Sequence, residues 1–194
     1  MRVGTKDRSS ATIREVLRSE TGQSHDLLDQ SLGSLDLCER GEYALFLQTQ
    51  LAARRPIEAW CAVNVPNEFL PPLQSPLIEA DLRAMASLVP ETVIGSLSAP
   101  PNGWLGVAWA VAGSSLGNRM MLKRLASRGS DLPRSFLGDD AMPAYFARIR
   151  PLLERPAAVA EALAEQVAAA GAVFGTFASA IPRAIQEPEF EQAA

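Results

Sequence analysis

Histidine is the scarcest reactive residue type in this chain, because His25 is the only one among 194 residues. A metal site built on two histidines is therefore excluded, and a Ser-His-Asp hydrolase could be built only around His25. The chain has two cysteines, Cys38 and Cys61, which are too few and too far apart for a zinc site. We expect both to be unreactive residues in or near the core, because a reducing cytosol disfavours a redox pair.

The chain also lacks a long hydrophobic run and an excess of positive charge. No apolar stretch approaches the roughly 20 residues that cross a bilayer, and residues 1–16 contain no apolar segment of a secretory signal. The formal net charge is -4, whereas nucleic-acid-binding proteins usually present a basic face. We therefore expect a cytoplasmic protein whose main partner is neither nucleic acid nor a membrane.

Apolar residues recur at steps of three and four, which is the period of amphipathic helices, and no segment alternates as a strand does. Helices are predicted over residues 11–33, 42–64, 77–88, 104–126, 143–153 and 157–181. Pro56 is expected to kink or break the second of these helices. The predicted fold class is all-α, as a compact helical bundle of one domain. This domain is expected over residues 11–183, with a flexible N-terminus at 1–10 and a solvated tail at 184–194.

The predicted helix 104–126 is unusual because it contains Gly106, Gly113 and Gly117. A glycine inside a helix costs about 1 kcal/mol relative to alanine. Gly113 and Gly117 are four residues apart and therefore lie on one face, where backbone can approach a neighbour closely or the helix can bend. Two interpretations remain open: tight packing against another helix, or bare backbone lying against a flat ligand.

His25 lies at the edge of the apolar stripe of the first predicted helix, with Asp29 one turn later and Arg18 two turns earlier. Neutral imidazole is a good ligand for iron. Asp29 can accept a hydrogen bond from the other ring nitrogen, which fixes the tautomer, and Arg18 can pair with an anionic group such as a propionate. The alternative is a surface histidine whose one interaction is the helical contact with Asp29.

Two segments together resemble the heme oxygenase family: SETGQSHDLLD in the first predicted helix and WAVAGSSLGNRMMLKRL in the glycine-containing helix. The resemblance is to the bacterial members that are often associated with phytochromes, and it covers roughly residues 11–181. The last predicted helix, with AAAGAVFGTFASAI, is similar to the family's last helix of small residues and phenylalanine.

This resemblance implies that His25 is the proximal iron ligand, with Asp29 hydrogen-bonded to it and Arg18 near a propionate. It also implies that Gly113 and Gly117 lie against the distal face of heme, where their missing side chains leave room for O2 and water. The further residues implied at the pocket are Ser114, Trp109, Asn118, Phe174 and Phe177. The weaker candidates for the heme edge are Tyr145, Arg148 and Arg150.

The sequence departs from the family's pattern beside these glycines. Many members carry an acidic residue next to the first distal glycine, which helps to organise water, and a second glycine directly after the later one. Ala112 or Ser114 stands at the first place and Asn118 at the second. Ser114, Ser115 or Asn118 would have to replace the acidic group. Trp109 stands where an aromatic residue, usually tyrosine, precedes the motif.

The activity implied is the O2- and electron-dependent ring opening of heme to biliverdin, CO and ferrous iron, in which heme is both cofactor and substrate. No electron-transfer centre is visible in the sequence, so the resemblance implies an external electron donor, a reductase or a ferredoxin. A phytochrome is a candidate acceptor of biliverdin.

Three other functions remain open at this stage. Ala112 and Asn118 are compatible with a heme-binding sensor or carrier that has lost catalysis on the same fold. A histidine phosphotransfer bundle would use an exposed His25, although Asp26 and Asp29 beside it would repel a phosphoryl group. A helical interaction module without a small ligand is the third.

Overall fold

The computed structural model describes residues 11–90, 95–157 and 159–182. Within these ranges the chain forms seven α-helices and two short 3-10 helices, and no strand beyond an isolated bridge between Thr12 and Pro156. The α-helices are α1 (Ile13–Gly33), α2 (Arg40–Asn64), α3 (Ser75–Ala84), α4 (Trp104–Gly113), α5 (Ser115–Ser127), α6 (Ala141–Leu153) and α7 (Ala160–Ala180), and the 3-10 helices are η2 (Asn67–Phe69) and η3 (Pro101–Gly103). The predicted all-α helical bundle is confirmed, while the expected flexible N-terminus at 1–10 and tail at 184–194 lie outside the described residues.

For two predicted helices, the structure differs from the prediction in whether the helix is continuous. α2 is not interrupted at Pro56, so of the kink or break predicted there the break does not occur. The helix continues because Leu51 and Ile57, on either side of the proline, are buried, and their packing outweighs the roughly 3 kcal/mol that an interior proline costs. The predicted helix 104–126 is instead divided at Ser114, which separates α4 from α5.

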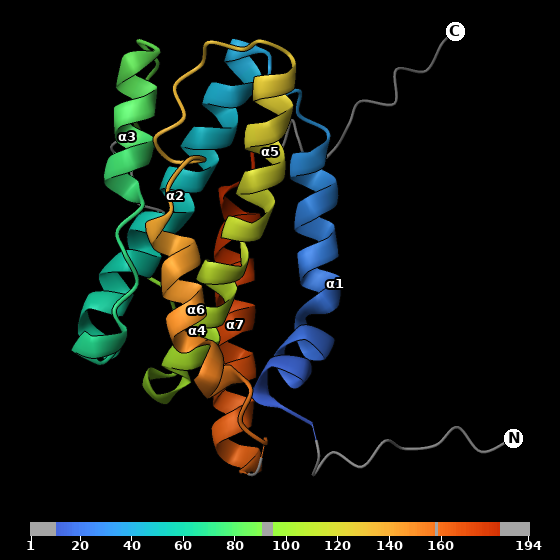
Figure 1. Cartoon of the computed structure of the whole chain (residues 1–194). Helices are drawn as coiled ribbons and strands as arrows, with labels where there is room; N and C mark the ends of the chain where they lie inside the picture. Colours follow the sequence, from blue (N-terminus) through green and yellow to red (C-terminus); the bar gives the residue numbers. More distant parts are fainter. Residues whose placement is uncertain (1–10, 91–94, 158, 183–194) are drawn as a thin grey trace, which may run out of the picture.

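α7 lies in the middle of the bundle, where it contacts α1, α2 and α4 (Figure 1). Its contact with α4 is the tightest, because two glycines allow the backbones to meet. A Cβ atom at Gly103 would lie 2.5 Å from the Cβ of Ala169, and one at Gly106 would overlap the backbone carbonyl oxygen of Gln166. The close helix packing that glycines permit therefore occurs at the start of α4.

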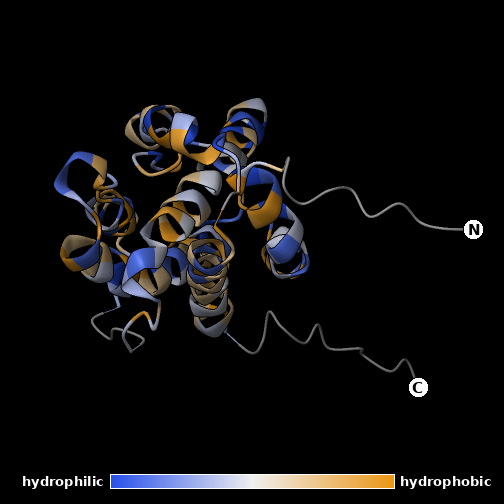
Figure 2. Ribbon diagram, turned by 90° about the horizontal axis from the view of Figure 1, so that it is seen from below, coloured by the Kyte–Doolittle hydropathy of each residue, from blue (hydrophilic) through white to orange (hydrophobic). Residues whose placement is uncertain are grey.

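The buried apolar side chains form two clusters that share α2. One joins the second half of α2 to α1, α4, α6 and α7, and the other joins the first half to α3, α5 and the connection that follows α5. Figure 2 shows that the helices combine hydrophilic and hydrophobic residues, as helices that bury one side do. No helix in the described part of the chain has the length and apolarity needed to cross a membrane.

A buried carboxylate ties the connection after α5 to α3. Asp81 is fully buried, and its two carboxylate oxygens accept hydrogen bonds of 2.9 Å from the backbone N–H groups of Ser135 and Phe136. Charge-assisted bonds of this kind offset the cost of burying the carboxylate. They fix Phe136 in the second cluster, where its ring packs against that of Phe46.

The first turn of α1 is tied to the connection between α6 and α7. Thr12 forms a capping box with Glu15, in which the Glu15 N–H donates to the Thr12 hydroxyl and the Thr12 N–H donates to the Glu15 carboxylate. The backbone N–H of Ile13 donates to the carbonyl oxygen of Arg155 at 3.0 Å. These bonds hold the N-terminal end of α1 against the rest of the bundle.

The other end of α1 is tied to α5 through Asp36. Its carboxylate forms ion pairs with Arg124 at 3.3 Å and with Arg128 at 2.9 Å. A hydrogen bond from the backbone N–H of Cys38, together with these two guanidinium groups, holds the pKa of Asp36 below its usual value. α1 is thus held at both ends, while most side chains of residues 18–30 between them are exposed.

The α4–α7 contact yields a prediction for two glycine variants. Gly106→Ala should lower the free energy of unfolding by about 1–3 kcal/mol, because its Cβ overlaps a backbone atom of α7. Gly113→Ala should leave it unchanged or raise it by about 0.5–1 kcal/mol, because its Cβ meets nothing within 4 Å and alanine favours the helix. Urea denaturation measures both changes. Equal destabilisation by the two variants would contradict the close contact.

Candidate functional site

His25 stands on the exposed middle part of α1, with 53% of its side chain accessible to solvent. Its Nδ1 atom lies 3.3 Å from a carboxylate oxygen of Asp29 and 3.9 Å from one of Asp26. A carboxylate at this distance can accept the Nδ1–H hydrogen bond, which leaves Nε2 with its lone pair available. No residue in the described part of the chain hydrogen-bonds to Nε2, so the ring can ligate a metal through this atom.

A row of three rings joins α1, α7 and α4 at this place. The rings of His25 and Phe174 meet edge to face with centroids 6.1 Å apart, and those of Phe174 and Trp109 meet in the same way at 6.2 Å. Edge-to-face contacts at this separation are favourable. Three residues predicted at the site from the sequence therefore lie together, although they are distant in the chain.

The backbone at Gly113 and Gly117 faces open space. A Cβ atom at either glycine would meet nothing within 4 Å, in contrast to the crowded positions at Gly103 and Gly106. Of the two interpretations of this glycine pair, tight packing against another helix is therefore excluded. The bare backbone of the α4–α5 bend is available to lie against a ligand.

The bend itself is held by Ser114. Its hydroxyl donates to the carbonyl oxygen of Val111 at 2.7 Å and accepts a hydrogen bond of 2.9 Å from the Nη2 atom of Arg54. The N–H of Gly117 donates to the carbonyl oxygen of Ser114 at 3.2 Å, a short turn that starts α5. Because the one hydroxyl hydrogen of Ser114 is used within the bend, the hydroxyl can offer a ligand an acceptor and not a donor.

A pocket of about 390 Å³ opens between α1 and α7, next to the Phe174 ring. Its walls are formed by Ser24, Leu27, Leu28, Ser31, Gly171, Phe174, Gly175, Ala178 and Ile181. The Phe174 ring lines this pocket and also contacts the ring of His25. His25 itself does not line the pocket, and the glycines of the α4–α5 bend do not line it either. The open backbone at the bend is therefore not part of this pocket.

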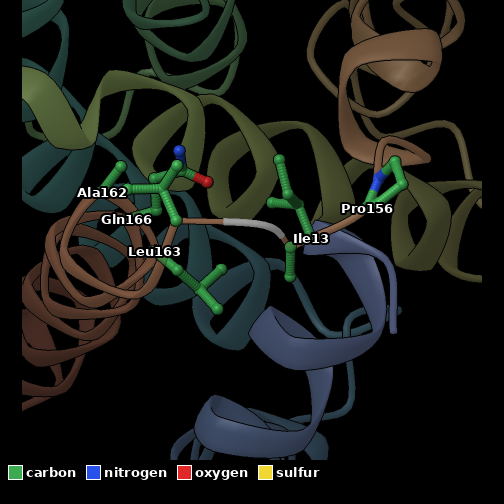
Figure 3. A pocket seen from close by; sticks show the side chains of 7 residues that line it. Ile13, Pro156, Ala162, Leu163 and Gln166 are labelled. Carbon is green, nitrogen blue, oxygen red and sulfur yellow. The ribbon is translucent and has the colours of Figure 1, made fainter. Parts of the chain in front are cut away.

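A smaller hollow of about 170 Å³ lies at the other end of α1 (Figure 3). Ile13 and Pro156 form one side of it, and Ala162, Leu163 and Gln166 of α7 form the other. Ile13 is 12 residues, or about 18 Å of helix, away from His25. This hollow is therefore not part of the site around the histidine.

Three other residues predicted at the site do not belong to the row of rings: Asn118, Phe177 and Arg18. Asn118 is 9% exposed and has no hydrogen-bond partner among the described residues, so its amide is free to serve a ligand. Phe177 is buried, and its ring centroid lies 5.8 Å from the guanidinium carbon of Arg54. Arg18 is exposed on α1 and contacts no ring of the row.

The weaker heme-edge candidates on α6 are bound to other parts of the fold. Tyr145 is buried and its hydroxyl donates to the carbonyl oxygen of Phe69 at 2.8 Å. Arg148 donates to the carbonyl oxygen of Leu70. The third candidate, Arg150, pairs with Glu154 at 3.6 Å. The structure does not bring these three residues to the ring row.

Sequence reasoning missed two features of the site. Arg54 reaches Ser114 from α2, and no signal distinguishes it in the sequence from its neighbour Arg55. Gly171 and Gly175 line the larger pocket, and a Cβ at either would meet nothing within 4 Å. Their spacing of four residues, the same as that of the glycine pair at the bend, could have revealed them.

The described residues offer neither a cluster of metal-binding side chains nor a reactive thiol at Cys61. Within the ranges that the structure describes, no group of three or more His, Cys, Asp or Glu side chains could hold a metal ion. Cys38 and Cys61 are free thiols, and burial raises the pKa of the Cys61 thiol to about 12. A thiol protonated at neutral pH is a poor nucleophile, in agreement with the expected unreactive role of Cys61.

No family model matches this sequence, and no curated protein matches it. Among solved structures, the chain is similar to the heme oxygenase from Neisseria meningitidis, whose structures with NO and CO bound have been determined. The TM-score is 0.73 at 17% sequence identity, over 90% of this chain and 92% of that one. A likeness at this identity establishes the fold, so this chain has the all-helical fold of heme oxygenase.

Proposed function

We propose that this chain binds heme between α1 and the α4–α5 bend, with His25 as the residue that would ligate the iron, and that it degrades this heme as a heme oxygenase. The observation that carries the proposal is the position of the only histidine. Its ring is half exposed, lies in edge contact with Phe174, and keeps Nε2 free of any partner in the described chain. The likeness in fold to a heme oxygenase supports the proposal.

The residues present fit a flat ligand that contains iron. The imidazole of His25 supplies the donor atom that iron accepts readily. The Phe174 and Trp109 rings supply apolar surface, and the bare backbone at Gly113 and Gly117 supplies a face without side chains. A macrocycle needs a ligand on one side and free space on the other, and these residues provide both kinds of surface.

Each of these residues has a definite task in the proposed reaction. Asp29 can accept the Nδ1–H hydrogen bond, which orients the ring of His25 and directs its Nε2 atom to the iron. Phe174 and Trp109 keep water from one side of the site, while the amide of Asn118 can bind water at the other. Arg18 is exposed and long enough to reach a propionate at the edge of the ligand.

Bound heme supplies the iron that reacts with O2 and the ring that is opened to biliverdin, CO and ferrous iron. The electrons come from a separate reductase or ferredoxin in this proposal, and a phytochrome is the candidate acceptor of biliverdin.

The second candidate function is a heme-binding sensor or carrier without catalysis. It is favoured by the composition of the bend, where Ala112 and Ser114 flank Gly113 and the Ser114 hydroxyl is used internally. Hemin-loaded protein supplied with ascorbate and O2 distinguishes the two functions. The enzyme would convert the heme band into the absorption of biliverdin, whereas a carrier would keep a stable heme spectrum.

The role of His25 yields a prediction for heme affinity. Loss of a residue that orients a metal-bound histidine costs about 10-fold to 100-fold in affinity, so Asp29→Ala should weaken hemin binding by that factor and His25→Ala by more. Titration with hemin, followed by absorption, measures both constants. Asp26→Ala is the control, because its carboxylate lies farther from the ring at 3.9 Å. Absence of any heme band for the wild-type protein at micromolar concentration would refute the proposal.

The open face at Gly117 yields a second prediction. Gly117→Leu should fold normally, because this position is exposed and meets nothing within 4 Å, yet its side chain should fill the space proposed for O2. We expect CO binding to the ferrous heme complex and ascorbate-driven turnover to fall about tenfold or more, the effect of a displaced reacting group. Gly41→Leu is the control, because Gly41 is equally exposed and open at the start of α2. If Gly117→Leu keeps full turnover, the bend does not face the heme.

A further inference from the structure

Arg54 is a buried cation without an acidic partner. It lies in the middle of α2, is 2% exposed, and is the largest of the fully buried side chains. Within the described chain its guanidinium forms no ion pair. Glu58 and Asp139 act on it electrostatically, but their carboxylates accept hydrogen bonds from other groups. A buried charge without an ion-pair partner is costly, so its presence calls for a role.

The contacts of Arg54 connect the two core clusters to the α4–α5 bend. Its guanidinium lies 5.0 Å from the ring centroid of Phe136 in one cluster and 5.8 Å from that of Phe177 in the other. Its Nε donates to the side-chain oxygen of Gln50 at 3.3 Å, and its Nη2 donates to the Ser114 hydroxyl at 2.9 Å. Burial lowers the pKa of Arg54 to about 10, so the group remains charged at neutral pH.

We propose that Arg54 is a positioning residue: through the Ser114 hydroxyl it fixes the bend between α4 and α5, and with it the open backbone at Gly113 and Gly117. The Cβ positions of both glycines are free of neighbours, and α4 and α5 contain no acidic residue. The serine cannot rotate away without breaking two hydrogen bonds, one of which is charge-assisted.

Two polar side chains at the bend, those of Ser114 and Asn118, differ in whether they already form hydrogen bonds within the protein. The Ser114 hydroxyl accepts a hydrogen bond from Arg54 and donates one to the carbonyl oxygen of Val111, so both interactions are within the protein. Asn118 lies one turn later and has no hydrogen-bond partner among the described residues, so its amide can serve a ligand. The consequence for bound heme rests on the proposed function, whereas the positioning of the bend does not.

Amide hydrogen exchange in the ligand-free protein tests the positioning. Ser114→Ala removes one hydroxyl and should raise exchange at residues 111–118 by about tenfold or more, because a hydrogen bond to a charged group is lost. Arg54→Met should do the same, and Arg54→Lys, which keeps the charge, should have a smaller effect. Arg55→Met is the matched control, because Arg55 is the next residue and pairs instead with Glu79 at 3.0 Å.

Several outcomes would overturn the proposal. Wild-type exchange rates at the bend in Ser114→Ala would show that the hydroxyl does not hold it, even if Arg54→Met fails to fold. An equal rise at the bend in Arg55→Met, or a uniform rise over all helices in Ser114→Ala, would show only general destabilisation.

The ferric absorption spectrum of the hemin complex and its pH dependence give the second measurement, and both should change in Ser114→Ala. Faster exchange with an unchanged spectrum would mean that the bend does not contact heme. If the wild-type protein binds no hemin, the proposed function fails, while the exchange result still decides the role of Arg54.

Discussion

The backbone contact between α4 and α7 is the interaction on which the rest of the structure depends. Gly103 and Gly106 allow the two helices to approach until side-chain and backbone atoms of α7 fill the place of a Cβ. At this separation the Phe174 ring of α7 reaches both Trp109 of α4 and His25 of α1. A wider spacing would separate the three rings. Glycines in this part of the chain thus have opposite roles, since Gly103 and Gly106 bring helices together and Gly113 leaves open space.

Much of the fold could be predicted from the sequence, because amphipathic helices leave a strong periodic signal and this chain has no competing strand pattern. The positions where helices begin and end were harder to predict from the sequence. α2 continues through Pro56 because burial of its neighbours dominates, and no local signal reports burial. The division at Ser114 likewise depends on a hydrogen bond from Arg54, which is 60 residues away in the chain.

The candidate site was predictable where a residue type was rare or a spacing was regular. His25 stood out as the only imidazole, and the Gly113–Gly117 spacing indicated a bare face that the structure places in open space. The role of His25 as an iron ligand stays a prediction. Arg54 was not predictable, because two adjacent arginines look alike until a fold buries one and pairs the other with Glu79.

The attachment of α1 at both ends has a consequence for the position of His25. The backbone N–H of Ile13 donates to Arg155 in the α6–α7 connection. Asp36, three residues after the end of α1, pairs with Arg124 of α5 and with Arg128 directly after α5. The part of α1 that carries His25 lies between these two attachments, and the contact of its ring with Phe174 of α7 is a third link to the bundle. A change at either end of α1 would therefore alter the position of the His25 ring, although Ile13 is 12 residues and Asp36 is 11 residues away from it.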